Sequence, residues 1–393
     1  MIYLDHHATT PLDPRALEAM LPLLGEHYAN PGSIAHAAGR RVAEMTGDAT
    51  ARLAALLGAE ADELVITSGA TESNNLALFG VCLHPRQKRR RVVSVVSEHR
   101  AILDPLKRLA QVGFDVTLAP VHSNDSPLAG QVDMEQLAEA ITPETALVSV
   151  MLANNEIGVI QPLRQIAELC RANGCLLHTD ATQAVGRLPV NVDTVDVDLL
   201  SFSAHKFYGP KGVGGLYVRR RGRRIKLLAQ IVGGGQQQNF RSGTLNSAGI
   251  VGMAAALTST LEGLVDDTVR IQRQRDRLFQ LLQQGLDFVL LNGPPLHGQD
   301  NPRLSGNLNC SFFPLEGQSL MLATPDLAVS SGSACTTAEP MASHVLRSLG
   351  LSEEISRSSL RFGVGRYNTD REIEQAAQWL IAAATDLGKF LAN

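Results

Sequence analysis

The chain has few cysteines, and their arrangement excludes two kinds of small scaffold. There are five in 393 residues, an odd number without the spacing of a disulfide framework. No pair is spaced as in a structural zinc site, so we expect no resident metal. This use of cysteine is typical of a reducing compartment, and we expect a cytoplasmic protein. The five are Cys82, Cys170, Cys175, Cys310 and Cys335.

The chain also lacks a long hydrophobic run and an excess of charge of one sign. No run of about 18 apolar residues occurs, so we expect no membrane span. We expect no secretory leader either, since Asp5, His6 and His7 interrupt the first residues. With 35 basic and 39 acidic side chains, the net charge of −4 gives no electrostatic footprint for nucleic acid. At roughly 150 residues per domain, the length predicts two or three domains.

Short apolar runs alternate with helical patterns from about Glu63 to Val218. Continuous apolar runs flanked by turn residues are typical of strands covered on both faces. Their alternation with helices predicts an α/β fold with a mostly parallel, doubly wound sheet of seven strands. The predicted strands are residues 63–67, 91–96, 115–119, 146–151, 176–179, 198–202 and 215–219.

After Gly233 the pattern changes and predicts a second, smaller α/β domain. A helical pattern covers residues 247–284, and its charged stretch 270–277 is typical of an exposed connector. An apolar strand follows at residues 308–313. We expect a large domain over residues 15–261 and a small domain formed by residues 1–14 and 262–393.

The chain has only six lysines, and Lys206 stands out by its position. It follows the predicted strand 198–202, behind Ser203 and His205, and precedes a glycine-rich turn. Ligands of open α/β sheets bind beyond the carboxyl ends of the strands. A lysine there can form a Schiff base with a carbonyl compound. The alternative is a surface lysine paired with an acid.

Asp180 follows another predicted strand end. An acid so close to buried apolar residues costs free energy unless it meets a cation. The ring nitrogen of pyridoxal phosphate (PLP) supplies such a cation, and a carboxylate there keeps the ring an electron sink. Asp180 and Lys206 are 26 residues apart, one strand–helix–strand unit, so their strands are expected to lie close together. The alternative for Asp180 is a helix N-cap.

A phosphate needs a cradle, and residues 67–72 offer one between a strand and a helix. Backbone donors at the helix N-terminus and the Thr71 hydroxyl form an anion site, with Ser203 and His205 as further donors. Neither this segment nor the glycine-rich residues 209–215 has the order of a Walker loop, which excludes a nucleotide hydrolase. His99, at a third strand end, is a candidate for stacking on a cofactor ring and moving protons. A structural histidine is the alternative.

Cys335 lies in a run of small polar residues, 330–337, which predicts a mobile loop with an exposed thiol. The other four cysteines occupy apolar or helical contexts, and we expect them to be inert packing. Arg361 lies inside a strand-like segment. Such an arginine often binds a carboxylate in bidentate fashion, and a buried ion pair is the alternative.

Together these segments resemble the PLP-dependent cysteine desulfurases of the NifS/IscS type, within the class V aminotransferase group. The resemblance covers nearly the whole chain, in order, and implies the fold of type I PLP-dependent transferases. Each motif is weak by itself, whereas the ordered set with the cysteine-bearing loop is specific. The matching segments are residues 3–5, 8–11, 30–33, 67–72, 154–158, 180–183, 201–206, 241–244, 330–335, 361–362 and 365–366.

The resemblance implies a role for each matching site residue. Lys206 would hold PLP and move the α-proton, Asp180 would pair with the pyridine nitrogen, and His99 would stack on the ring. Gln183 would hydrogen-bond the phenolic oxygen. Thr71, Ser203 and His205 would bind the phosphate, and Thr244 would reach it from the second subunit of a homodimer. Ala70 would also contact the cofactor.

The resemblance also implies the reaction and its partners. Asn155 and Arg361 would hold the carboxylate of L-cysteine, with Asn155 also contacting the cofactor. Cys335 would attack the substrate sulfur, leaving alanine and an enzyme persulfide. The sulfur would pass to an acceptor or iron–sulfur scaffold protein, and Cys335 could ligate a transient cluster.

Three other functions stay open at this point. A selenocysteine lyase on the same scaffold would not need Cys335, because selenium can be released without a protein nucleophile. A catalytically silent binding protein would lack bound PLP. An ordinary aminotransferase would release a keto acid in place of alanine.

Overall fold

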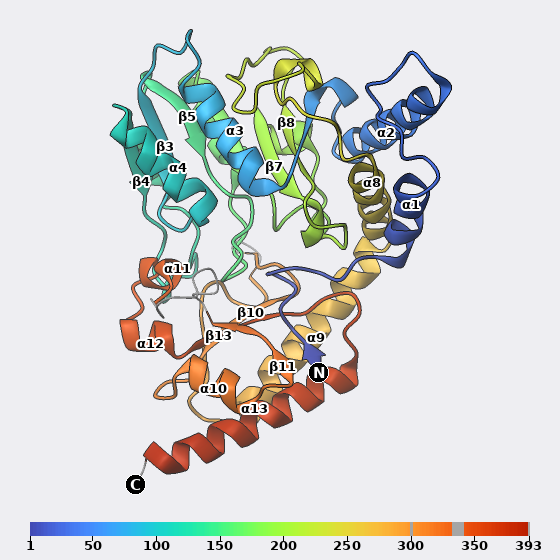
Figure 1. Cartoon of the computed structure of the whole chain (residues 1–393). Helices are drawn as coiled ribbons and strands as arrows, with labels where there is room; N and C mark the ends of the chain where they lie inside the picture. Colours follow the sequence, from blue (N-terminus) through green and yellow to red (C-terminus); the bar gives the residue numbers. More distant parts are fainter. Residues whose placement is uncertain (299–301, 332–341, 392–393) are drawn as a thin grey trace.

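The computed structural model describes residues 1–298, 302–331 and 342–391. A seven-stranded sheet lies at the centre of its larger part (Figure 1), in the order β2-β8-β7-β6-β5-β3-β4. The predicted strands are all present, with ends shifted by at most two residues. They are β2 Leu64–Thr67, β3 Arg91–Val95, β4 Asp115–Ala119, β5 Thr145–Ser149, β6 Leu176–Asp180, β7 Leu199–Ser203 and β8 Gly214–Val218.

The sheet is mostly parallel, as the sequence predicts. Strands β3 to β7 pair in parallel, whereas β8 runs antiparallel to both β2 and β7. In the β6–β7 pair, Asp180 lies opposite Ser201. This register brings the carboxyl ends of β6 and β7 to the same edge of the sheet, where ligands of such sheets bind.

Helices cover both faces of this sheet (Figure 1). Neighbouring residues of β7 show the two faces: Leu199 packs in a cluster with α3 and α4, and Leu200 packs in a larger cluster with α2, α6 and α8. Because both faces are buried, the strands are continuous apolar runs and lack an alternating pattern. The helices are α1 Pro14–Leu24, α2 Ala37–Leu56, α3 Ala70–Cys82, α4 Arg100–Gln111, α5 Met134–Ala140, α6 Leu163–Ala172, α7 Val192–Val195, α8 Ser247–Glu262, α9 Leu264–Gly285, α10 Gly317–Ala323, α11 His344–Ser348, α12 Glu353–Arg357 and α13 Asp370–Leu391.

The helical pattern predicted over residues 247–284 is two helices, α8 and α9. They meet at Gly263 with a bend of 72°. Among the described residues no single helix is long and apolar enough to cross a membrane, and this bent pair passes that test only when its two helices are taken together. Helix α8 packs on the large sheet, and α9 leads into the smaller part of the molecule (Figure 1).

The smaller part has its own sheet and its own core. Strands β12, β13, β10 and β9 form an antiparallel sheet in that order, and β1 pairs in parallel with β11. The core joins Ile2 and Leu4 of the N-terminus to residues of α9 and α13. The bounds are β1 Ile2–Tyr3, β9 Leu290–Leu291, β10 Asn307–Ser311, β11 Leu327–Ala328, β12 Ser330–Ser331 and β13 Ser359–Gly363.

One C-terminal helix departs from this division. Val345 and Leu346 of α11 are buried in the cluster of the large sheet, although Val329 before α11 and Leu360 after it pack in the smaller core. The division into residues 15–261 and residues 1–14 with 262–393 stays our proposal, with α11 as a segment that reaches across it.

The smaller core can be tested by a substitution in β10. Leu308 is fully buried, so Leu308→Ala should lower the free energy of unfolding by about 2–5 kcal/mol through lost burial and a cavity. Urea titration followed by the fluorescence of Trp379, the single tryptophan, which packs against this core, measures the change. Leu290→Ala, at a leucine 53% exposed in the adjacent strand, is the matched control. Equal shifts for the two variants would contradict this assignment of the core.

Candidate active site

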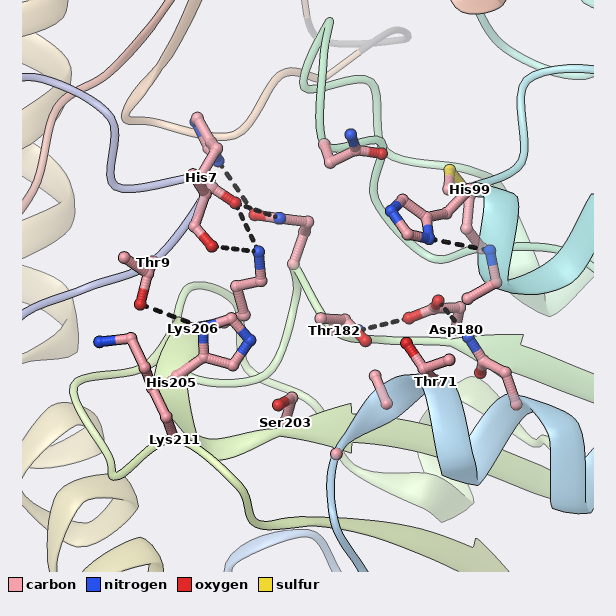
Figure 2. Close-up of a pocket in the computed structure, with 18 of the residues that line it drawn as sticks. His7, Thr9, Thr71, His99, Asp180, Thr182, Ser203, His205, Lys206 and Lys211 are labelled. Atoms are coloured by element: carbon pink, nitrogen blue, oxygen red, sulfur yellow. Dashed lines mark hydrogen bonds between the residues drawn. The ribbon is translucent and has the colours of Figure 1, made fainter. Parts of the chain in front are cut away.

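A cavity of about 590 Å³ lies where the carboxyl ends of the parallel strands meet (Figure 2). Figure 2 shows Lys206 and His205 on one side of it and His99 and Asp180 on the other. Ten of the residues predicted from the sequence line this cavity. They are Ala70, Thr71, His99, Asn155, Asp180, Gln183, Ser203, His205, Lys206 and Arg361.

Two predicted site residues are not placed in this cavity. Thr244 is exposed on the surface and does not line it. Cys335 lies in residues 332–341, outside the described part of the chain. Their roles, like those of the residues in the cavity, stay predictions.

Lys206 ends a single helical turn directly after β7. Its Nζ donates hydrogen bonds to the backbone oxygens of His7 and Ala8, both at 2.7 Å. Burial lowers the pKa of Lys206 to about 7, and repulsion from Arg187 and Arg361 adds to the effect. A large fraction of the amine is thus neutral near pH 7, the form that attacks a carbonyl carbon.

Asp180, the last residue of β6, is buried and points into the cavity (Figure 2). Its Oδ2 accepts a hydrogen bond from Asn74 Nδ2 at 2.7 Å, and its Oδ1 accepts one from the Thr182 amide at 2.9 Å. Asp180 forms no ion pair with any residue that the structure describes. A buried carboxylate held by two donors, with an open cavity before it, suits a cationic ring nitrogen.

His99 is both structural and part of the cavity wall. It is the N-cap of α4, where its Nδ1 accepts a hydrogen bond from the Ala101 amide at 3.0 Å. This bond leaves the ring proton on Nε2. Burial is the main cause that lowers the pKa of His99, so the ring is neutral near pH 7. A neutral, fixed ring presents a flat face to the cavity.

The turn before α3 forms a cradle for an anion. Gly69 has a φ of 150°, and no side chain caps the helix that follows. A Cβ on Gly214 would lie 2.7 Å from the Cα of Gly69, so glycine at that position lets β8 approach this turn. Ser203 and Thr71 line the same part of the cavity, and Lys211 adds a positive charge. Helix donors, hydroxyls and a cation suit a phosphate group.

His205 completes this side of the cavity. Its Nδ1 lies 3.1 Å from the Thr9 hydroxyl oxygen. Burial lowers the pKa of His205 to about 4, and the nearby Lys206 and Lys211 contribute. His205 is therefore a neutral hydrogen-bonding group near pH 7.

Arg361 fits both of its sequence interpretations. From β13 its Nη2 donates to Asp5 Oδ1 at 2.8 Å and to the Ser330 hydroxyl at 3.1 Å, while Nη1 donates to the Asn155 backbone oxygen at 3.1 Å. It is thus part of a buried ion pair. Its Nε has no partner among the described residues, and its side chain lines the cavity. A guanidinium in the cavity wall suits a substrate carboxylate.

Sequence reasoning missed four residues of this site. His7 and Arg187 hold Gln183: Nδ1 of His7 lies 3.0 Å from Gln183 Oε1, and Arg187 donates to the same oxygen. Asn74 holds Asp180, and Lys211 stands beside the cradle. Of these four, only His7, in the pair of histidines before Ala8, and Lys211, soon after Lys206, have a local signal in the sequence.

The residues of the cavity fit PLP. The cofactor needs an amine to attach to, a site for its phosphate and a counter-charge for its ring nitrogen. Lys206, the cradle at Gly69 and Thr71, and the unpaired carboxylate of Asp180 meet these three requirements in one cavity. The fit rests on the donor chemistry of the described residues.

Comparison with known proteins agrees with this fit to PLP. Residues 2–376 match the family described as aminotransferase class-V. The cysteine desulfurase IscS of Rickettsia akari is 45% identical over 99% of this chain and 92% of its own length. That of Anaeromyxobacter sp. is 47% identical over 97% and 91%. A probable mitochondrial cysteine desulfurase of Dictyostelium discoideum is 45% identical over 96% and 82%.

Solved structures agree with the sequence comparison. A NifS-like protein superposes with a TM-score of 0.88 at 33% identity, covering 98% of this chain and 99% of its own. A NifS-like protein from Rickettsia africae gives a TM-score of 0.84 at 28% identity over the same shares.

The pKa of Lys206 can be measured without the cofactor. Acetic anhydride reacts with neutral amines, so acetylation of Lys206 in PLP-free protein should rise with pH through a midpoint near 7. Quantitative mass spectrometry of its peptide across pH 5–11 gives that midpoint. In Arg187→Gln the midpoint should move upward, because a repelling cation is gone. A midpoint near an ordinary lysine pKa of about 10.4 would contradict the burial of the amine.

Proposed function

We infer the function from the premise that this chain belongs to the class-V aminotransferase family and, within it, to the cysteine desulfurases. It is a PLP-dependent enzyme that takes sulfur from L-cysteine. The observation that carries the proposal at the level of residues is one cavity that joins the buried amine of Lys206 to the buried carboxylate of Asp180. Our proposals concern what each residue does there.

The overall reaction balances without an external oxidant. L-Cysteine and the thiol of Cys335 give L-alanine and a persulfide on Cys335. One Cβ–S bond breaks and one S–S bond forms, so the two sulfur atoms are oxidised by two electrons in total and Cβ is reduced by two. The two thiol protons, one from L-cysteine and one from Cys335, end on Cβ of alanine and on the persulfide, so no net proton is taken from the site. PLP, when bound, supplies the electron sink that makes the Cβ–S bond breakable.

The chain's own residues bind the cofactor and the substrate, orient them and transfer protons. We propose that Lys206 attaches the cofactor and afterwards carries the proton at Cα, which an amine with a pKa near 7 can accept and return. Asp180 balances the charge of the ring nitrogen, and His99 stacks on the ring with its neutral face. Arg361 and Asn155 bind the carboxylate of the substrate, which fixes the direction of its side chain.

The nucleophile of the transfer is the thiolate of Cys335. We propose that it attacks the substrate sulfur and then passes the persulfide sulfur to the thiol of an acceptor protein, one that serves iron–sulfur assembly or another sulfur delivery. In vitro a small thiol can replace that acceptor and release sulfide. A cluster that rests on Cys335 would be a later, transient stage.

A homodimer would complete the cradle. Thr244 belongs to an exposed segment whose Val232 is 80% exposed and which also exposes Leu228 and Ile231. Large exposed apolar residues gathered in one segment mark an interaction surface. We propose that a second copy covers this segment, so that Thr244 of each subunit reaches the phosphate site of the other.

We also propose a cytoplasmic location. The four described cysteines are buried and unpaired, which suits a reducing compartment.

The persulfide route is tested by Cys335→Ala with L-cysteine and a small thiol reductant. Wild type should release alanine and sulfide in equal amounts, whereas the variant should release neither above about a hundredth of that rate, because the nucleophile is gone. Alanine by amino-acid analysis and sulfide by colour reaction give the two rates. L-Selenocysteine is the second substrate: a selenocysteine lyase would keep its activity in Cys335→Ala, and that result would favour the alternative function.

The position of Thr244 is tested with hybrid dimers of differently tagged chains. If Thr244 acts in the other subunit, a hybrid of Lys206→Ala with Thr244→Ala contains one intact site and regains about half of wild-type activity. The second hybrid joins wild type to a chain that carries both Lys206→Ala and Thr244→Ala. Its only intact Lys206 then lies in a site without Thr244, so this hybrid should retain PLP poorly and have low activity. The reverse order of the two activities would place Thr244 in its own subunit's site.

A further inference from the structure

The segment that carries Cys335 connects the two cores of the molecule. Before it, Val329 packs in the smaller core, and Ser330 and Ser331 form β12 beside β13. After it, Val345 and Leu346 of α11 are buried in the core of the large sheet. The described ends on both sides of residues 332–341 are therefore attached to different parts of the protein.

The end after this segment is held by a buried carboxylate. Ser343 donates its hydroxyl proton to Glu156 Oε2 at 2.5 Å. The same hydroxyl oxygen accepts hydrogen bonds from the amides of Val345 and Leu346, both at 3.1 Å, as the N-cap of α11. A serine hydroxyl has one proton and two lone pairs, so all of its bonds are used. Glu156 thereby determines which way the Ser343 proton points.

Glu156 lies directly after a residue of the cavity wall. Asn155 lines the cavity, and its backbone oxygen accepts a hydrogen bond from Arg361. The Glu156 amide donates to Asn154 Oδ1 at 2.8 Å, and the Glu156 backbone oxygen accepts from Asn307 of β10 at 3.0 Å. One residue thus touches the cavity turn, the small sheet and the end of the cysteine segment.

A second bond attaches the same end to the rim of the cavity. His344 Nε2 donates to the backbone oxygen of Glu98 at 2.8 Å, and Glu98 precedes His99 of the cavity wall. At the other end, Ser330 accepts a hydrogen bond from Arg361 at 3.1 Å. Each attachment is therefore made by a residue of the cavity wall or by its neighbour in sequence.

The charge of Glu156 suits such a role. Its carboxyl is buried, and burial raises its pKa to about 7, with Ser343, Arg361 and Arg100 acting in the opposite direction. Keeping a carboxyl in such a place costs free energy unless its hydrogen bond is made. Loss of the bond to Ser343 is accordingly unfavourable.

We propose that Glu156 is a positioning residue for sulfur transfer: its hydrogen bond to Ser343 fixes the end of the segment that carries Cys335 against the turn that presents Asn155 to the substrate. This inference rests on the proposed function, in which Cys335 is the nucleophile. Ser343 is eight residues beyond Cys335 in the sequence, so we expect the bond to affect the rate of sulfur transfer and to leave the thiol's own reactivity unchanged.

The test is a single-turnover measurement on the PLP-loaded enzyme. Variants Glu156→Ala and Ser343→Asp are mixed with L-cysteine, quenched at intervals and alkylated, and the persulfide on Cys335 is quantified by mass spectrometry. Ser343→Asp keeps a side-chain oxygen for the cap of α11 but cannot donate to Glu156 and repels it. Both variants should form the persulfide about tenfold more slowly, the size expected for one charge-assisted hydrogen bond.

Three companion measurements separate positioning from general damage. PLP content, the Kd for L-cysteine from the change in cofactor absorbance, and the alkylation rate of Cys335 without substrate should all stay within about twofold of wild type. Glu156→Gln, whose amide oxygen can accept from Ser343, should recover most of the persulfide rate. Glu168→Ala, at an exposed glutamate of α6, is the control and should behave as wild type.

The outcomes separate this inference from the function on which it rests. If wild type forms the persulfide on Cys335 and Glu156→Ala forms it equally fast, the positioning role of Glu156 is wrong and the proposed function stands. The same holds if PLP content or cysteine affinity falls in proportion to the rate. If wild type forms no persulfide on Cys335, the proposed function fails and takes this inference with it. In a double variant of Glu156→Ala with Ser343→Asp, the loss of rate should not exceed the larger of the two single losses, because both substitutions remove the same hydrogen bond.

Discussion

The pairing of β6 with β7 is the constraint on which the site depends. Asp180 lies opposite Ser201 in this register, and Lys206 follows Ser201 by five residues. A slip by one residue would turn every side chain of a strand to the opposite face and remove the carboxylate from the cavity. Asp180 ends β6 and Lys206 lies in the turn directly after β7, so the backbone hydrogen bonds between these two strands bring the two groups together. The rigidity of the sheet therefore limits how far the two groups can move relative to each other.

Much of this architecture is predictable because burial on both faces leaves a simple mark in sequence. The strand ends, and with them Asp180, His99 and Lys206, follow from continuous apolar runs and the rule for open sheets. The break at Gly263 is not predictable in this way, because the helical pattern continues through it. His7, Asn74 and Arg187 arrive at the site from segments far away in sequence, and only tertiary contacts bring them there.

Several residues here both make a structural contact and line the cavity. His99 caps a helix and lines the cavity, and Arg361 forms a buried ion pair with Asp5 while one of its donors stays unused. Asp180 likewise closes a turn through Thr182. These local bonds hold each side chain in one orientation before any ligand binds, so little ordering remains to be done at the moment of binding. Weighing the two interpretations as rivals would miss this dual use.

The placement of the four described cysteines has a consequence for a protein that handles reactive sulfur. Persulfides exchange with accessible thiols, so a protein with several exposed thiols would transfer the sulfur to its own surface cysteines. Cys82, Cys170, Cys175 and Cys310 are all buried, and burial raises the pKa of Cys82 to about 12. The fold thus keeps these four thiols away from the persulfide that we propose for Cys335, which leaves a thiol of the acceptor protein as its partner for exchange.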